Sequence, residues 1–180
     1  MSKKVLIISS SPLKGGNSNT LCDEFQKGAE MSGNKAEKIF LRDKKINFCH
    51  SCGYCRANDY NRCSQKDDMN QIIEKMLEAD VILMATPVYF YAMCGQMKVF
   101  IDRCCAKYTK ISNKEFYFII TAADNNKAAL ERTVEEFRGF LDCLNSPVEK
   151  GILYATGVWK KGEVLSTEFP QQAFELGSAV

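Results

Sequence analysis

The chain has 180 residues, of which 46% are apolar and 26% are charged, and its formal net charge is +2. These values are typical of one globular domain, and the charge is too small to indicate binding to nucleic acid or to a membrane surface. Its apolar runs fall well short of the ~20 residues that span a bilayer. The first residues lack the long apolar region and cleavage site of a signal peptide, so we expect a cytoplasmic protein.

Short apolar runs alternate with amphipathic segments along the chain. Five apolar runs predict strands buried on both faces, over residues 4–9, 35–41, 80–87, 115–122 and 149–157. Five segments with helical spacing predict helices, over residues 21–33, 67–79, 95–108, 126–144 and 168–180. We expect Asp67 or Asp68 to cap the second of these helices.

This alternation predicts an α/β fold, in which a parallel sheet carries helices on both faces. Five strands in one domain favour the flavodoxin-like order 2-1-3-4-5, a three-layer sandwich. We expect a single domain over residues 1–180 with a cysteine-rich insertion at 47–66. In such a sheet, ligands bind at the carboxyl ends of strands 1 and 3, where the strand order reverses.

The loop after the first strand reads SSSPLKGGNSNT and opens a helix. Free N–H groups at a helix start favour an anion. Polar side chains able to add donors are Ser9, Ser11, Asn17, Ser18 and Thr20. The loop lacks the glycine patterns of nucleoside triphosphate and dinucleotide sites, which favours a single phosphate monoester. The alternative is a plain turn in which Asn17 or Ser18 caps the helix.

The loop after the third strand reads ATPVYFYAMCG. Pro87 removes an N–H group and turns the chain outward. Tyr89, Phe90 and Tyr91 could then flank a flat ring, or they could pack into the core or a subunit interface. Taken together, the two loops indicate a ligand with a phosphate at one end and a planar ring at the other, which is the shape of FMN.

Several stretches, in this order, resemble the NADPH-dependent FMN reductases of the flavodoxin superfamily, and among them the iron–sulfur flavoproteins. The stretches are SSSPLKGGNSNT, CHSCGYC with a later cysteine, DDM, ATPVYF and MKVFIDR. The resemblance covers nearly the whole chain. It implies non-covalent FMN and a homodimer or homotetramer with flavin sites near the subunit contacts.

The resemblance also assigns residues to the flavin. The phosphate is assigned to Ser11, Pro12, Lys14, Asn17, Ser18 and Thr20. The ring is assigned to Pro87, Val88, Tyr89, Phe90 and Tyr91. A third flavin-facing loop is assigned to Thr121, Ala122, Ala123 and Asp124. The chain departs from the family pattern at Ser10, where glycine is usual, and at Leu13, where arginine is usual. The second departure removes a cation near the phosphate, for which Lys14 is the candidate substitute.

Nine cysteines in a chain without an export signal argue against a disulfide framework. Four of them, Cys49, Cys52, Cys55 and Cys63, are separated by two, two and seven residues. Their segment follows the second strand, so we expect it on the same rim as the flavin. Four thiolates could hold a [4Fe–4S] cluster, zinc could take the same four or three with His50, or the loop could be metal-free.

The remaining cysteines are interpreted as small buried apolar residues. They are Cys22, Cys94, Cys104, Cys105 and Cys143. We expect Asp102 and Arg103 to serve a helix salt bridge or a dimer contact, and Trp159 to lie on the ligand rim.

A flavin needs no side-chain nucleophile, which agrees with a chain that has one histidine. We therefore expect an FMN-dependent oxidoreductase that takes electrons from NAD(P)H and reduces a flavin, a quinone or a similar small-molecule acceptor. The alternative is an iron–sulfur flavoprotein that transfers electrons from a ferredoxin-like donor.

Overall fold

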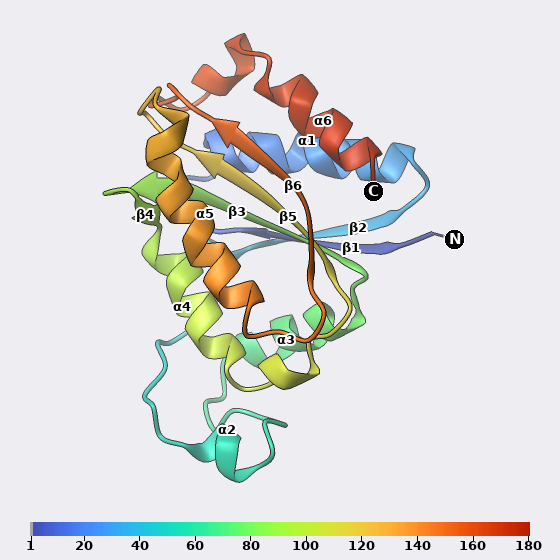
Figure 1. The fold of residues 1–180 in the computed structure, drawn as a ribbon, viewed down its shortest axis with the longest axis vertical. Coiled ribbons are helices and arrows are strands. Elements are labelled where there is room, and N and C mark those ends of the chain that lie inside the picture. Colours follow the sequence, from blue (N-terminus) through green and yellow to red (C-terminus); the bar gives the residue numbers. More distant parts are fainter. Residues whose placement is uncertain (1) are drawn as a thin grey trace.

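The computed structural model describes residues 2–180 (Figure 1). Its parallel strands are β1 (Lys4–Ser9), β2 (Lys35–Phe40), β3 (Val81–Tyr89), β5 (Glu115–Thr121) and β6 (Val148–Ala155). Their order across the sheet is β2-β1-β3-β5-β6, which confirms the order 2-1-3-4-5 expected from the sequence. A further strand, β4 (Ala92–Met93), was not expected and pairs antiparallel with the end of β3.

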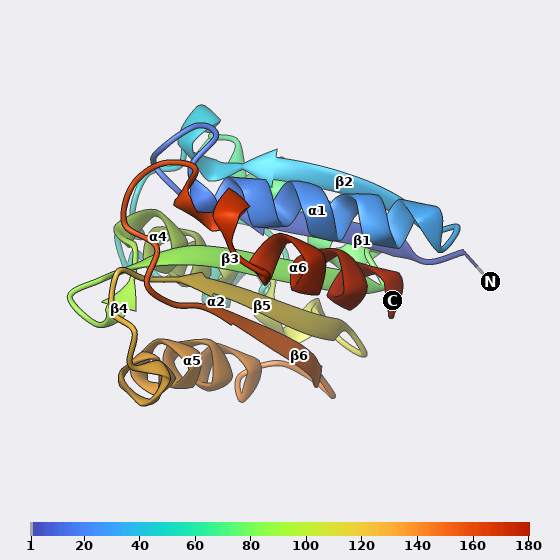
Figure 2. The same ribbon diagram turned by 90° about the horizontal axis from the view of Figure 1, so that it is seen from above.

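Helices cover both faces of the sheet (Figure 2). One face carries α1 (Asn17–Met31) and α6 (Phe169–Ser178), and the other carries α3 (Met69–Glu78), α4 (Gly95–Cys104) and α5 (Lys127–Leu141). Within β1, Val5 packs on the α1 side and Leu6 on the α3 side. Both faces of the strands are therefore buried, which is why they read as continuous apolar runs.

The helices α1 and α6 lie side by side in Figure 2 and approach each other at two glycines. A Cβ atom on Gly28 would lie 2.1 Å from the Phe174 carbonyl oxygen, and one on Gly177 would lie 2.1 Å from the Phe25 carbonyl oxygen. Any larger residue at either position would push the helices apart. This contact fixes α1, whose N-terminal end forms part of the candidate site.

The helix starts differ from the sequence-based expectations in two places. Helix α1 begins at Asn17, earlier than the predicted residue 21, because its first turn is polar and carries no apolar signal. At α3, Asp68 occupies the N-cap position, but its carboxylate accepts from the Lys45 N–H instead of capping the helix. Asp67 accepts from the Met69 N–H at 3.3 Å, so Asp67 serves the helix start.

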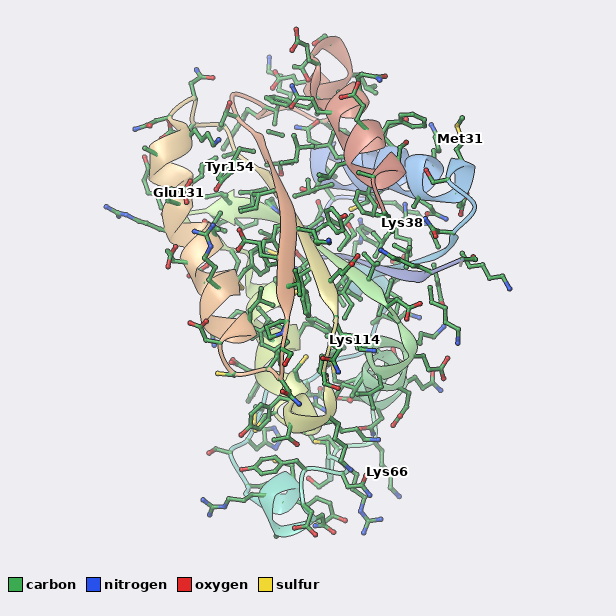
Figure 3. The ribbon with its side chains drawn as sticks, turned by 45° about the vertical axis from the view of Figure 1, so that its right-hand side comes forward. Met31, Lys38, Lys66, Lys114, Glu131 and Tyr154 are labelled. Carbon is green, nitrogen blue, oxygen red and sulfur yellow. The ribbon has the colours of Figure 1, made fainter. Side chains whose placement is uncertain are left out.

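Residues 47–66, the cysteine segment, project from the body of the molecule and contain the short helix α2 (Tyr54–Ala57) (Figure 1). Lys66, at its end, is labelled in this projecting region in Figure 3.

The edge strand β6 is tied to α5 by Tyr154 and Glu131, which lie side by side in Figure 3. The Tyr154 hydroxyl donates to Glu131 Oε1 at 2.8 Å, and burial together with this bond raises the pKa of Tyr154. Between residues 2 and 180, no helix is long and apolar enough to cross a bilayer.

Candidate functional site

The loops that follow β1, β3, β5 and β6 meet around one cavity of about 230 Å³. The cavity therefore unites the three loops that the sequence analysis assigned to one ligand. The assigned residues that line it are Ser11, Asn17, Ser18, Pro87, Val88, Tyr89, Thr121, Ala122 and Ala123.

The start of α1 faces this cavity without a capping side chain. Its N-cap residue is Gly16, and Asn17 and Ser18 lie inside the helix, so the alternative that either of them caps it is wrong. Gly15 has φ +67°, which favours glycine, and a Cβ atom on Gly16 would lie 2.9 Å from the Leu13 carbonyl oxygen. The first N–H groups of this fifteen-residue helix are thus left for an anion.

Two serines, Ser11 and Ser18, line the same cavity as the start of α1. Ser11 Oγ accepts from the Leu13 N–H at 3.2 Å, which holds the loop in its turn. Ser18 Oγ lies 2.6 Å from Thr121 Oγ1, and this buried hydrogen bond joins the loop after β1 to the loop after β5.

Asn17 positions the loop after β6, residues 156–164. Its Nδ2 donates to the Lys160 carbonyl oxygen at 3.0 Å, and its Oδ1 accepts from the Gly162 N–H at 3.0 Å. Glu163 Oε2 accepts from the Trp159 N–H at 2.6 Å and the Lys160 N–H at 2.7 Å, and these bonds keep the pKa of Glu163 below its usual value. These bonds therefore hold the second half of the loop, from Trp159 to Glu163, against the start of α1.

This loop brings Lys161 to the cavity. In the described part of the chain, Lys161 is the one charged residue that lines it. Its Nζ lies 3.4 Å from the position that a Cβ atom on Gly15 would occupy, so the ammonium group sits beside the turn before α1. Sequence reasoning missed Lys161, although the pair KK next to Trp159 on the expected rim was an available signal. Trp159 also lines the cavity, and its side chain is largely exposed.

The aromatic loop is a tight hairpin. Phe90 and Tyr91 are its two turn residues, with φ of 52° and 60°, between the paired residues Tyr89 and Ala92. Such a turn favours Asn-Gly, and bulky side chains are strained in it. Phe90 is fully exposed, so packing of its ring into the core is excluded. The Tyr91 hydroxyl donates to Asp124 Oδ2 at 3.0 Å, which ties the hairpin to the loop after β5.

Other assigned residues lie near the cavity without lining it. Ser9 is buried, the Pro12 carbonyl accepts from Arg42, and the Thr20 hydroxyl donates to the Gly16 carbonyl. The full set of assigned residues outside the lining is Ser9, Pro12, Lys14, Thr20, Phe90, Tyr91 and Asp124. Ser10, found where the family usually has glycine, is accommodated because its hydroxyl donates to the Ala85 carbonyl at 2.8 Å.

The cysteine segment forms a second pocket of about 290 Å³. Its sulfur-bearing residues are Cys49, Cys52, Cys55, Cys63 and Cys105. This pocket shares no lining residue with the first cavity, so the expectation that the segment lies on the flavin rim is wrong. The chain leaves β2 and instead runs alongside the C-terminal end of α4, where Arg103 and Cys105 line the same pocket.

The surroundings of the sulfurs suit thiolates. The Ser51 N–H donates to Cys49 Sγ and the Gln65 N–H to Cys63 Sγ, each at 3.5 Å. The Tyr54 N–H and the Ser64 hydroxyl lower the pKa of Cys52. N–H groups directed at sulfur are a feature of iron–sulfur ligation.

Over residues 2–180, no three His, Cys, Asp or Glu side chains converge closely enough to hold a single metal ion. The geometry therefore gives no support to a zinc site. A four-iron cluster binds each thiolate through a different iron atom, so its ligands need not converge in this way, and the all-thiol donor set fits it.

Arg103 links the cysteine segment to α4. It pairs with Asp67 and also donates to the Asn47 carbonyl at 2.6 Å and to Cys63 Sγ at 3.6 Å. The expected helix salt bridge is confirmed for Asp102, which pairs with Lys98 within α4 at 2.5 Å. Arg103 forms a salt bridge too, but its partner Asp67 lies outside α4.

The structure separates the remaining cysteines into two groups. Cys22, Cys94 and Cys104 are buried as expected. Cys105 and Cys143 are exposed, so the interpretation of these two as core residues is wrong. Burial of part of the side chain and the neighbouring Cys55 raise the pKa of Cys105 to about 11.

The sequence model of the NADPH-dependent FMN reductase family matches residues 3–159. An iron–sulfur flavoprotein of Archaeoglobus fulgidus is 41% identical over 100 residues, which cover 56% of this chain and 44% of the relative. A putative NAD(P)H-dependent FMN-containing oxidoreductase of Bacillus subtilis is 27% identical over 74% of this chain and 75% of its own length. The chain thus spans about half the length of the iron–sulfur flavoprotein that it matches at 41% identity.

A solved NAD(P)H:quinone oxidoreductase from Methanothermobacter marburgensis superposes with a TM-score of 0.78 at 15% identity, over 99% of this chain and 96% of that one. At this identity the likeness shows the fold, which is flavodoxin-like as the strand order indicated.

Proposed function

Because the chain belongs to the family of NADPH-dependent FMN reductases, we propose that it binds FMN in the cavity between the loops after β1, β3, β5 and β6 and acts as an FMN-dependent oxidoreductase. The observation that carries this proposal is the uncapped N-terminus of α1, which opens on that cavity beside Lys161.

The phosphate of FMN is assigned to this end of the cavity. The N–H groups at the start of α1 and the hydroxyls of Ser11 and Ser18 would donate to its oxygens, and Lys161 would supply the positive charge. In this arrangement Lys161, contributed by the loop after β6, takes the place of the arginine that the family has at position 13. Lys14 is outside the cavity lining and has a smaller part.

The ring of FMN is assigned to the rest of the cavity, against Pro87, Val88 and Tyr89 and the loop Thr121–Ala123. The flavin supplies hydride and electron transfer when bound. The side chains of this chain bind and orient it, and the electrons would come from NAD(P)H and pass to a flavin, a quinone or a similar small acceptor.

A second copy of the chain would complete the ring site. The cavity of about 230 Å³ is smaller than the ~300–1,000 Å³ usual for cofactor sites, and exposed aromatic side chains stand at its edge. Phe90, Tyr91 and Trp159 are the aromatic residues available for such a contact. We therefore propose a homodimer or homotetramer, and a cytoplasmic location remains a prediction.

The four clustered thiols favour a second candidate function, electron transfer through a [4Fe–4S] cluster with a ferredoxin-like donor. Cys49, Cys52, Cys55 and Cys63 would hold the cluster. Because their pocket is separate from the flavin cavity, electrons would pass to a flavin only where a second copy brings the two sites together.

Steady-state oxidation of NADPH and NADH by FMN-loaded protein, with free FMN or a quinone as acceptor, separates the two functions. Turnover with either nucleotide supports the reductase. If a protein that retains bound flavin turns over neither nucleotide but accepts electrons from reduced ferredoxin, the reductase is contradicted and the second function is favoured.

A further inference from the structure

Cys105 is a fifth thiol in the cysteine pocket, although it lies far from the other four in the sequence. It follows the last residue of α4, and its Sγ is 3.9 Å from Cys55 Sγ. Among residues 2–180, no other pair of cysteine sulfurs is in hydrogen-bonding contact. The close sulfur pair therefore joins one member of the thiol set to the body of the protein.

Several contacts hold Cys55 against Cys105. The Tyr60 N–H donates to the Cys55 carbonyl oxygen at 2.8 Å, and the Tyr60 ring packs edge-on against Tyr108 with centroids 5.2 Å apart. Lys110 Nζ donates to Asn61 Oδ1 at 2.7 Å. These bonds join the end of the α2 region to the residues that follow α4, so the two sulfurs face each other in a supported arrangement.

We propose that Cys55 and Cys105 form a reversible disulfide when the metal-free protein meets a small-molecule disulfide, and that this bond withdraws Cys55 from the four-thiol set. Cys105 is exposed and Cys55 partly exposed, so a small oxidant reaches both. Turning of the two side chains must shorten the contact to the ~2.05 Å of a disulfide.

The chemistry is thiol–disulfide exchange, which needs only one of the two thiols as a thiolate. One sulfur attacks the small disulfide and releases one small thiol, which leaves a mixed disulfide on the protein. The second sulfur then attacks this bond and releases the other small thiol. In sum, two protein thiols lose two hydrogen atoms and the small disulfide is reduced to two thiols.

The internal bond rests on the sulfur geometry alone, whereas its effect on metal uptake rests on the second candidate function proposed above. Cys55 would be the one cluster ligand lost, while Cys49, Cys52 and Cys63 stay reduced. Reduction would restore the complete set. The pair would thus prevent cluster assembly under oxidising conditions and protect that ligand from further oxidation.

The test treats full-length, metal-free protein with oxidised glutathione and maps disulfides in non-reduced peptides by mass spectrometry. The expected product is a Cys55–Cys105 linkage, with two hydrogens lost, that dithiothreitol reverses. The variant Cys143→Ser, which removes another exposed thiol, should give the same linkage, and Cys105→Ser should give none to Cys55. A main internal disulfide among Cys49, Cys52 and Cys63, or glutathione adducts with no internal bond, would overturn the proposal.

Iron content after anaerobic reconstitution with iron and sulfide is the second readout. The oxidised protein should take up no cluster, and the same sample after reduction should take up one. Equal iron in the two samples would contradict the effect on loading. If the reduced protein takes up no iron, the cluster function fails and with it the effect on loading, while the linkage map still decides the disulfide.

Discussion

Arg103 and Asp67 form a bidentate ion pair in which Nη1 lies 2.6 Å from Oδ2 and Nη2 lies 2.9 Å from Oδ1. Their side chains are 1% and 0% exposed. Since Arg103 also bonds to Asn47 and Cys63, one guanidinium ties the start of the cysteine segment to its end. The pair therefore brings the stretch DDM, which contains Asp67, into contact with the stretch MKVFIDR, which contains Arg103.

The substitution Asp67→Asn should therefore destabilise the protein strongly. It leaves a buried guanidinium uncompensated, and removing one partner of a buried pair costs about 3–5 kcal/mol. The control is Asp102→Asn, which breaks an exposed pair and should cost about 1 kcal/mol or less. The free energy of unfolding measured by urea titration compares the two, and equal small losses would show that the pair does not anchor the segment.

The same pair makes the segment sensitive to acid. Burial opposes the charge of Asp67, but the hydrogen bonds from Arg103 and the Asn47 N–H prevail and lower its pKa. Its contribution to stability is thus complete above the unfolded pKa of about 3.9 and is lost as the pH falls through the lower folded value. We expect proteolysis within residues 47–66 to accelerate below about pH 4. An acid-stable protease, with cleavage sites read by mass spectrometry, tests this, and an unchanged rate down to about pH 2 would contradict it.

Lys161→Ala should weaken FMN binding by about tenfold or more, because a hydrogen bond to a charged group is worth about 1.5–3 kcal/mol. Lys160→Ala is the matched control, since the neighbouring Lys160 does not line the cavity and should keep wild-type affinity. Quenching of flavin fluorescence measures both. Riboflavin lacks the phosphate, so its affinity should be the same in wild type and Lys161→Ala, and a parallel loss of riboflavin affinity would argue for a general distortion of the site.

The hairpin at Phe90 and Tyr91 should gain stability when both residues are replaced, as Phe90→Asn with Tyr91→Gly. Both residues have a left-handed backbone conformation, which costs about 1–2 kcal/mol of folding free energy for each aromatic residue. Asn-Gly is the pair that this turn favours. Part of the gain is offset because the hydrogen bond from Tyr91 to Asp124 is lost. Thermal unfolding without flavin tests the gain, and a lower melting temperature would show that the aromatic contacts outweigh the strain.

Local sequence patterns were sufficient for the fold, because strands buried on both faces read as apolar runs and their alternation with helices limits the topology. The same argument identified the cavity-lining loops after β1 and β3, since the carboxyl ends of adjacent parallel strands must meet, and the family resemblance added the loop after β5. It could not find Lys161, which reaches the cavity only because Asn17 and Glu163 hold a distant loop in place. It also misplaced the cysteine segment, whose course depends on the Arg103–Asp67 pair rather than on the strand it follows.

The central claim is that the start of α1 and Lys161 hold the phosphate of FMN. Its most direct test is the dissociation constant of FMN compared with that of riboflavin for the wild-type protein, by fluorescence titration at one ionic strength. We predict one FMN per chain, bound at least tenfold more tightly than riboflavin. Equal affinities for the two flavins, or no binding of FMN, would contradict the account.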